Sequence, residues 1–451
     1  MYGTPFSLSD QSRFSTVFHT LKIGHLLRHT GIRKSFGLSG LAVFELLFSL
    51  VFEGKNGFRL LESSRGASLP GKDVVYRFLN HPGFVWRVFL HSLSLTMVRQ
   101  FAALTSAKRV QVFILGDSTF QRNRSKKAEL LARVFDHTTG RFAKGFTLLT
   151  LGWSDGFSFA PIDLIMLSSA KFVNRLTEMT ITITKRCQRY KRRVEALTHK
   201  PDAALGLIKR SLKAGFRADY VLMDSWFTQM PLIRGLATEG LDTIGMVKEM
   251  KQRYLYEGQR LTLSELYRRL PKNNHTSIWS SVIVKSSCGM LVKLVFVQNR
   301  NKRREWLAIL STDLTLEPNE IVRIYGMRWS IETFFKVTRS YLKLGTEFQG
   351  RSFDMLISHT TVVFSGYLVL EFERRETGDT RSLGGLFFLY SDEVRDLDYQ
   401  TALGQLMALF LNLAGATSKV GKQNVLCQLQ QWMADLPLYI KGLFSNLSCE
   451  S

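Results

Sequence analysis

The segment RVQVFILGDST, residues 109–119, is typical of a buried strand that ends in a polar turn. Two more strand-like runs follow within residues 144–167, and a Ser-Asp-Gly turn joins them. The chain then alternates, with a helix predicted over 202–216, a strand over 219–225, a second helix, and a strand over 241–247. Three strands followed by helix–strand–helix–strand predict an α/β fold with a mixed sheet.

Composition narrows the class of protein. The chain has 451 residues and a formal net charge of +24. Hydrophobic residues make up 45% of it, which excludes a disordered chain. Its four cysteines lie far apart with no CxxC pair, which excludes a disulfide scaffold and a zinc ribbon and predicts a cytoplasmic location. The charge favours a nucleic-acid partner, and a basic protein that binds none is the alternative.

Four regions differ in their pattern along the chain. Residues 1–105 read as short helices with tight turns, which suit a helical N-terminal DNA-binding domain or a plain helical bundle. Residues 106–247 and 306–375 hold the predicted α/β core, and the basic, β-rich segment 248–305 is inserted into it. Residues 376–451 read as a helical C-terminal region, for which we expect oligomerisation or, alternatively, packing on the rest of the chain.

Two apolar runs bear on a membrane partner. Residues 36–52 are about one turn too short to span a bilayer, and Glu45 lies near their centre. Residues 355–372 contain His359 and Glu371. Both runs are better explained as buried helices, so no membrane partner is expected.

Two acids follow apolar strands. Asp117 ends VFILGDS, and Asp224 ends YVLMDS. Carboxylates at strand ends lie at the rim of a sheet, and two of them held close together repel unless a cation neutralises them. A hard divalent ion is the natural ligand of such a pair. Taken singly, each Asp is also explained as a turn or N-cap residue.

A third acid lies in YGMRWSIETFFK, residues 325–336. On one continuous helix, Tyr325, Arg328, Glu332 and Arg339 share a face. One acid, two cations and a phenol suit a metal ion beside a phosphate. The alternative is a solvated face on which Arg328 and Glu332 form an i,i+4 ion pair.

These motifs resemble the bacterial insertion-sequence transposases of the DDE type, in the group with the signature Tyr-x2-Arg-x3-Glu-x6-Lys. Arg339 stands where the family has Lys, and Lys336 lies nearby. The resemblance implies an RNase H-like catalytic core with a β-rich insertion, flanked by helical regions. It implies that Asp117, Asp224 and Glu332 are catalytic and hold Mg²⁺ or Mn²⁺, while Tyr325, Arg328 and Arg339 contact DNA.

The same resemblance implies a transposase. Such an enzyme binds terminal repeats, cleaves double-stranded DNA at transposon ends, and transfers the 3′-hydroxyl ends into target DNA as a homodimer in a synaptic complex on the bacterial nucleoid. A metal-dependent nuclease that transfers no strands is one alternative. A non-catalytic DNA-binding protein derived from a transposase is another.

Further DNA contacts are expected from an aromatic residue and from basic clusters. In hairpin-forming members of the group a Trp before the signature helix stacks on a flipped base, and Trp306 matches it; a core aromatic is the alternative. The clusters include residues 185–193, KRCQRYKRR, and the following side chains: Arg122, Arg124, Lys126, Lys127, Arg303 and Arg304.

Overall fold

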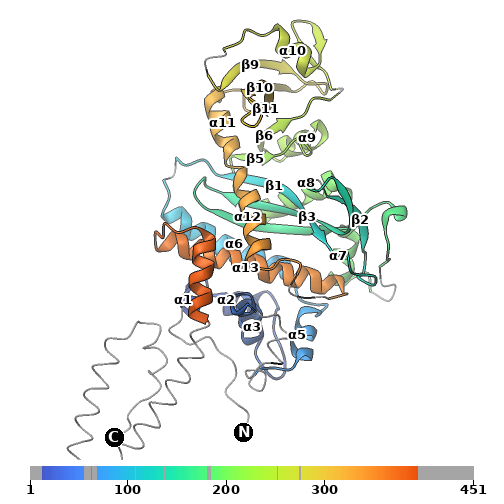
Figure 1. Cartoon of the computed structure of the whole chain (residues 1–451), viewed down its shortest axis with the longest axis vertical. Helices are drawn as coiled ribbons and strands as arrows, with labels where there is room; N and C mark the ends of the chain where they lie inside the picture. The colour runs from blue at the N-terminus through green and yellow to red at the C-terminus, as the bar shows by residue number, and fades with distance from the viewer. Residues whose placement is uncertain are drawn as a thin grey trace, which may run out of the picture. The chain divides into compact units, whose positions relative to one another are not determined.

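The computed structural model describes residues 13–54, 62, 69–106, 108–136, 138–179, 184–250, 252–273, 276–346, 348 and 350–394. They fall into two compact units (Figure 1). One unit lies within residues 1–86, 339–349 and 358–451, and the other comprises residues 87–338 and 350–357. The second unit contains the sheet and all three predicted acids.

Five strands form the centre of the sheet: β1 (Val112–Gln121), β3 (Arg141–Ser154), β4 (Phe159–Leu167), β5 (Tyr220–Met223) and β6 (Asp242–Val247). Strand β3 is antiparallel to both β1 and β4. Strand β5 is parallel to β1, and β6 is parallel to β5. The predicted α/β fold with a mixed sheet is therefore confirmed, and the order β4-β3-β1-β5-β6 is consistent with an RNase H-like fold.

In the part of the chain that the structure describes, the remaining strands extend this centre into one sheet of 11 strands: β2 (Ala132–Asp136), β7 (Tyr254–Tyr256), β8 (Gln259–Leu261), β9 (Ile278–Lys285), β10 (Leu291–Gln298) and β11 (Trp306–Ser311). Strand β2 pairs with β3. Strand β11 pairs with β6, and β10 and β9 follow it. The β-rich insertion is therefore continuous with the central sheet, because β11 joins the two hydrogen-bond ladders.

Helices of this unit cover the sheet: α6 (Trp86–Ala103), α7 (Gln188–Ala196), α8 (Lys200–Lys213), α9 (Met230–Thr238), α10 (Leu263–Arg269), α11 (Pro318–Gly326) and α12 (Trp329–Ser340), with a short 3-10 turn, η2 (Phe172–Asn174). Helices α7 and α8 pack on β4, α9 packs on β6, and α11 packs on β6 and β11. Thr262 and Glu265 form a capping box that starts α10.

The expected continuous helix from Tyr325 to Arg339 is wrong, because the chain forms α11 and α12 with a break at Met327 and Arg328. There the N–H groups of Met327 and Arg328 bond to carbonyls three residues earlier, in the tight pattern of a helix end. Tyr325 and Glu332 therefore belong to different helices.

The described residues of the other unit are mainly helical. It contains α1 (Arg13–Thr20), α2 (Ile23–His29), α3 (Gly40–Glu53), α5 (Lys72–Leu79) and most of α13 (Phe353–Glu376). Phe14 stacks on Tyr390 and contacts Phe48 and Phe52, so apolar helices and not strands build this core.

Helix α13 is long and apolar enough to cross a membrane by length and composition. Its most apolar window is 94% buried inside the protein, which is the pattern of a core helix. The segment expected to oligomerise, residues 376–451, lies outside the described residues beyond Val394.

Candidate active site

The site begins where helix α12 approaches strand β1 (Figure 1). A Cβ atom added to Gly116 would lie 2.9 Å from Cδ1 of Ile331. Glycine is therefore the residue that allows this close approach. Asp117 follows Gly116 and Glu332 follows Ile331, so the strand–helix contact brings the segments that carry the first and third acids together.

Asp117 lies within β1 and does not end it, which corrects the expected strand boundary. The strand continues to Gln121 because β3 pairs with it over its whole length, and Asp117 lies opposite Leu149. Strand β5 pairs with β1 only from Val112 to Ile114. Asp117 therefore lies beyond the end of β5, at the rim of the sheet, where β5 no longer pairs with β1.

Asp224 directly follows β5 and organises the next turn. Its Oδ1 accepts hydrogen bonds from the backbone N–H groups of Trp226 at 2.9 Å and Phe227 at 3.2 Å. This is the turn role that the sequence left open as an alternative, but it uses one carboxylate oxygen. In the parallel register of β1 and β5, Asp224 falls beside Gly116 and Asp117.

Glu332 lies on the first turn of α12 and pairs with Arg328, with 3.0 Å between Oε1 and Nη1. Arg328 also lies over the ring of Tyr325. Burial alone would lower the pKa of Arg328, but its interactions with Tyr325, Glu332 and Asp224 outweigh burial and raise this pKa. Burial first, and then the nearby Asp224, raise the pKa of Tyr325 to about 12 although Arg328 opposes the shift. The second and third acids thus share one electrostatic neighbourhood with Tyr325 and Arg328.

Asp117 pairs with Lys200, the first residue of α8, at 2.8 Å. Among the described residues, no three His, Cys, Asp or Glu side chains are positioned to hold one metal ion. The donor chemistry fits Mg²⁺ or Mn²⁺, since the three acids offer only oxygens. One oxygen of Asp117 pairs with Lys200, and one oxygen of Glu332 pairs with Arg328.

The expected DNA-binding residues differ in exposure. The accessible ones are Arg124, Lys126, Lys127, Arg303, Arg304, Lys336 and Arg339. Arg122 is buried and lies over the ring of Phe120, and burial lowers the pKa of Arg122 to about 10. A cation held against an apolar ring is less available to a phosphate than the exposed ones.

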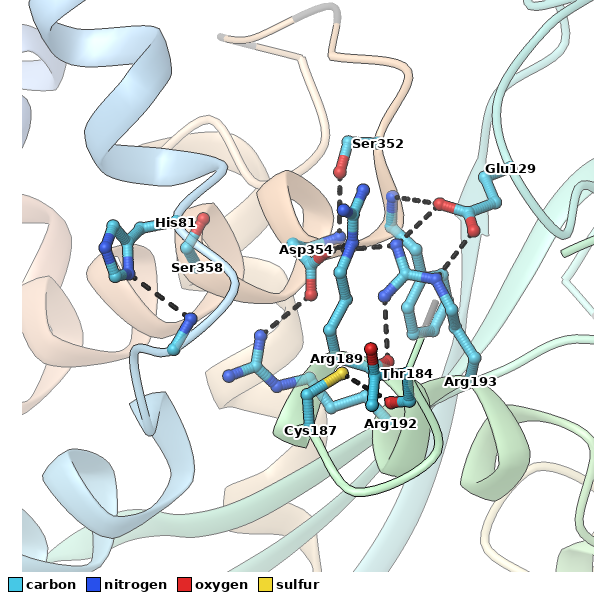
Figure 2. A network of polar contacts seen from close by, with 12 residues as sticks. His81, Glu129, Thr184, Cys187, Arg189, Arg192, Arg193, Ser352, Asp354 and Ser358 are labelled. Carbon is cyan, nitrogen blue, oxygen red and sulfur yellow. Dashed lines mark hydrogen bonds and ion pairs between the residues drawn. The ribbon is translucent and has the colours of Figure 1, made fainter. Parts of the chain in front are cut away.

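The basic run 185–193 was expected to bind DNA, but its last arginine is part of the protein interior (Figure 2). Arg193 is fully buried and makes two bonds of 2.6 Å to Glu129 and one of 3.0 Å to Asp354. Arg189 and Arg192 pair with the same Asp354. These three arginines join α7 to the loop that carries Glu129 and to the start of α13, so much of the run's charge is neutralised internally.

Trp306 is the first residue of β11 and packs among aromatic side chains. Its ring lies 5.1 Å from Phe296 and 5.2 Å from Tyr267. Because Trp306 is half-buried, this packing agrees with the alternative of a core aromatic, and base stacking stays a prediction.

The sequence interpretation missed three residues. Lys200 pairs with Asp117, Trp226 lies beneath the ammonium of Lys200, and Trp329 is 68% exposed beside Arg328. The signal for Lys200 was a cation at the first position of a helix, where negative charge is favoured. The signal for Trp329 was an aromatic on the polar side of an amphipathic helix.

Two protein families and one known transposase match parts of this chain. Residues 66–269 match the family described as DDE superfamily endonuclease, and residues 190–358 match the family described as transposase DDE domain. Over 198 residues the chain is 25% identical to the transposase for insertion sequence element IS1151 of Clostridium perfringens. That match covers 40% of this chain and 37% of the length of the relative.

Proposed function

Because this chain belongs to the DDE superfamily of transposases and endonucleases, we propose that it is an insertion-sequence transposase. It binds terminal repeats, cleaves DNA at the transposon ends, and transfers the 3′-hydroxyl ends into target DNA. The observation that carries this proposal is the common neighbourhood of Asp224, Tyr325, Arg328 and Glu332, beside Asp117 on the next strand.

Enzymes of this superfamily depend on divalent metals, and we propose that Asp117, Asp224 and Glu332 hold Mg²⁺ or Mn²⁺. Ions held there would promote attack by water or a 3′-hydroxyl and would stabilise charge on the leaving oxygen. The three acids come from three different segments of the chain. The site therefore depends on the packing of α12 against β1.

Arg328 and Tyr325 have separate roles in this proposal. The guanidinium of Arg328 can hold two oxygens of a phosphodiester, because its donors form a planar fork. Tyr325 stays protonated at neutral pH, since its pKa is raised to about 12. Its phenol can therefore donate a hydrogen bond to a phosphate oxygen, and in this proposal water or a 3′-hydroxyl attacks the phosphorus directly.

One experiment separates this function from its two alternatives. Purified full-length protein is incubated with DNA that carries the terminal repeats, target DNA and Mg²⁺. A transposase gives products in which ends are joined to target. A nuclease without strand transfer leaves only cut ends, and a non-catalytic DNA-binding protein gives retarded complexes with intact DNA.

The affinity for DNA is expected to fall steeply as the salt concentration rises. The exposed lysines that follow β1 should contribute to the slope of log K against log salt concentration. Replacing Lys126 and Lys127 by Ala should reduce the slope of log K against log salt by about 1 for each phosphate that these lysines neutralise. Arg323→Ala is the control, because Arg323 is already paired with Glu320. Fluorescence anisotropy of labelled DNA at several salt concentrations measures the slopes, and equal slopes in all three proteins would exclude this surface.

We also propose that two protomers pair to bring two transposon ends together, in the bacterial cytoplasm and on the nucleoid when DNA is bound. Residues 376–451 are the candidate contact. Sedimentation of the protein with and without end DNA, compared with a chain shortened after Val394, tests this contact.

A further inference from the structure

One cation links the turn of the second acid to the carboxylate of the first. The Nζ atom of Lys200 lies 2.8 Å from Oδ1 of Asp117. The same ammonium lies 3.8 Å from the ring centroid of Trp226 and 4.8 Å from that of Phe227. Both aromatic residues donate their backbone N–H groups to Asp224. Lys200 thus lies between the two segments that carry Asp117 and Asp224.

Helix stability does not explain this position. Lys200 is the first residue of α8, where the positive end of the helix dipole disfavours a cation. Its side chain is 17% exposed and that of Asp117 is 15% exposed, so water screens this pair less than a surface ion pair. A partly buried carboxylate without a counter-ion would be costly, and Lys200 provides that counter-ion.

We propose that Lys200 is the counter-ion of Asp117 in the metal-free protein and that a divalent cation must displace it to bind there. The inference rests on the proposed function, since it takes Asp117 as a metal ligand. An ammonium and a metal ion compete for the same carboxylate oxygen because both are attracted by its charge. After displacement the ammonium of Lys200 can stay in contact with the ring of Trp226, where a cation–π interaction stabilises it. Lys200 is therefore a positioning residue that sets how readily the site takes its ion.

The test is calorimetric titration of the full-length protein with Mn²⁺ alone, in the absence of DNA. Lys200→Met removes the competitor and keeps an apolar stem of similar length. We expect Lys200→Met to bind Mn²⁺ about tenfold more tightly than the natural protein, which corresponds to about 1.4 kcal/mol. In the natural protein, Mn²⁺ should also change the emission of Trp226, and Trp226→Phe identifies its share of the signal.

Lys209→Met is the matched control. Lys209 lies on the same helix and also forms an ion pair, at 3.0 Å with Glu239, but it is far more exposed. Its replacement should leave the Mn²⁺ affinity unchanged. The gain from Lys200→Met should also vanish in the background of Asp117→Asn, because the two residues act through one contact.

Two results overturn the proposal and are distinguishable. In the first, Asp117→Asn weakens Mn²⁺ binding while Lys200→Met leaves it unchanged or weakens it. That result would show that Lys200 does not compete with the ion, and it would still support Asp117 as a metal ligand. If Asp117→Asn binds Mn²⁺ as tightly as the natural protein does, Asp117 is not a metal ligand, and the metal site of the proposed function fails as well. Circular dichroism of each variant separates both results from loss of fold.

Discussion

Asp117→Ala and Glu332→Ala are each expected to lower the rate of DNA cleavage by about 10³-fold or more, while end binding stays within a few-fold of the natural protein. Metal ligation supplies several kcal/mol of transition-state stabilisation, and each 1.4 kcal/mol is about tenfold in rate. Binding depends mainly on phosphate contacts, which both substitutions leave in place. Single-turnover cleavage of labelled end DNA in Mg²⁺ measures the first effect, and gel retardation measures the second.

Glu320→Gln is the control for Glu332→Ala. Glu320 lies on α11, one helix earlier, and pairs with Arg323 much as Glu332 pairs with Arg328. Its replacement should leave cleavage unchanged. Normal cleavage by either triad variant would contradict the assignment of the acids, and an equally slow Glu320→Gln variant would show that the effect is not specific to the site.

Arg193→Ala is expected to lower the free energy of unfolding by about 3–5 kcal/mol, because it leaves the buried carboxylates of Glu129 and Asp354 without their shared partner. Arg193 is completely buried, and Asp354 is as well. Figure 2 shows both acids directed at the guanidinium of Arg193. Urea unfolding followed by circular dichroism measures the change.

Arg186→Ala belongs to the same basic run but replaces an exposed side chain. It should change the free energy of unfolding by at most about 0.5 kcal/mol. Equal free energies of unfolding for Arg193→Ala and Arg186→Ala would show that the buried network does not stabilise the fold. Residues 185–193 would then be interpreted simply as a DNA-binding patch.

Much of the fold could be predicted from local patterns in the sequence. Apolar runs with polar ends identified the strands around Asp117 and Asp224, and turn residues identified the hairpin between β3 and β4. These features depend on neighbours within a few residues. The break between α11 and α12 was not accessible, because Gly326 is tolerated inside many helices and only packing determines whether the chain continues.

The basic run illustrates a different limit. Its composition is equally compatible with a DNA-binding surface and with an internal ion network. The partners of Arg193 lie 64 residues away at Glu129 and 161 residues away at Asp354. No local pattern can report such pairs, since they form only when distant segments meet.

The sequence by itself determined the mixed α/β sheet, the order of its central strands, and the positions of the acids and of the signature residues around Glu332, because side-chain periodicity and residue chemistry are local properties. Only the tertiary structure decided which charges meet. It paired Asp117 with Lys200, grouped Asp224 with Tyr325 and Arg328, and buried Arg193. The physical reason is that electrostatic interaction depends on distance and burial, and both are set by contacts between residues far apart in the chain.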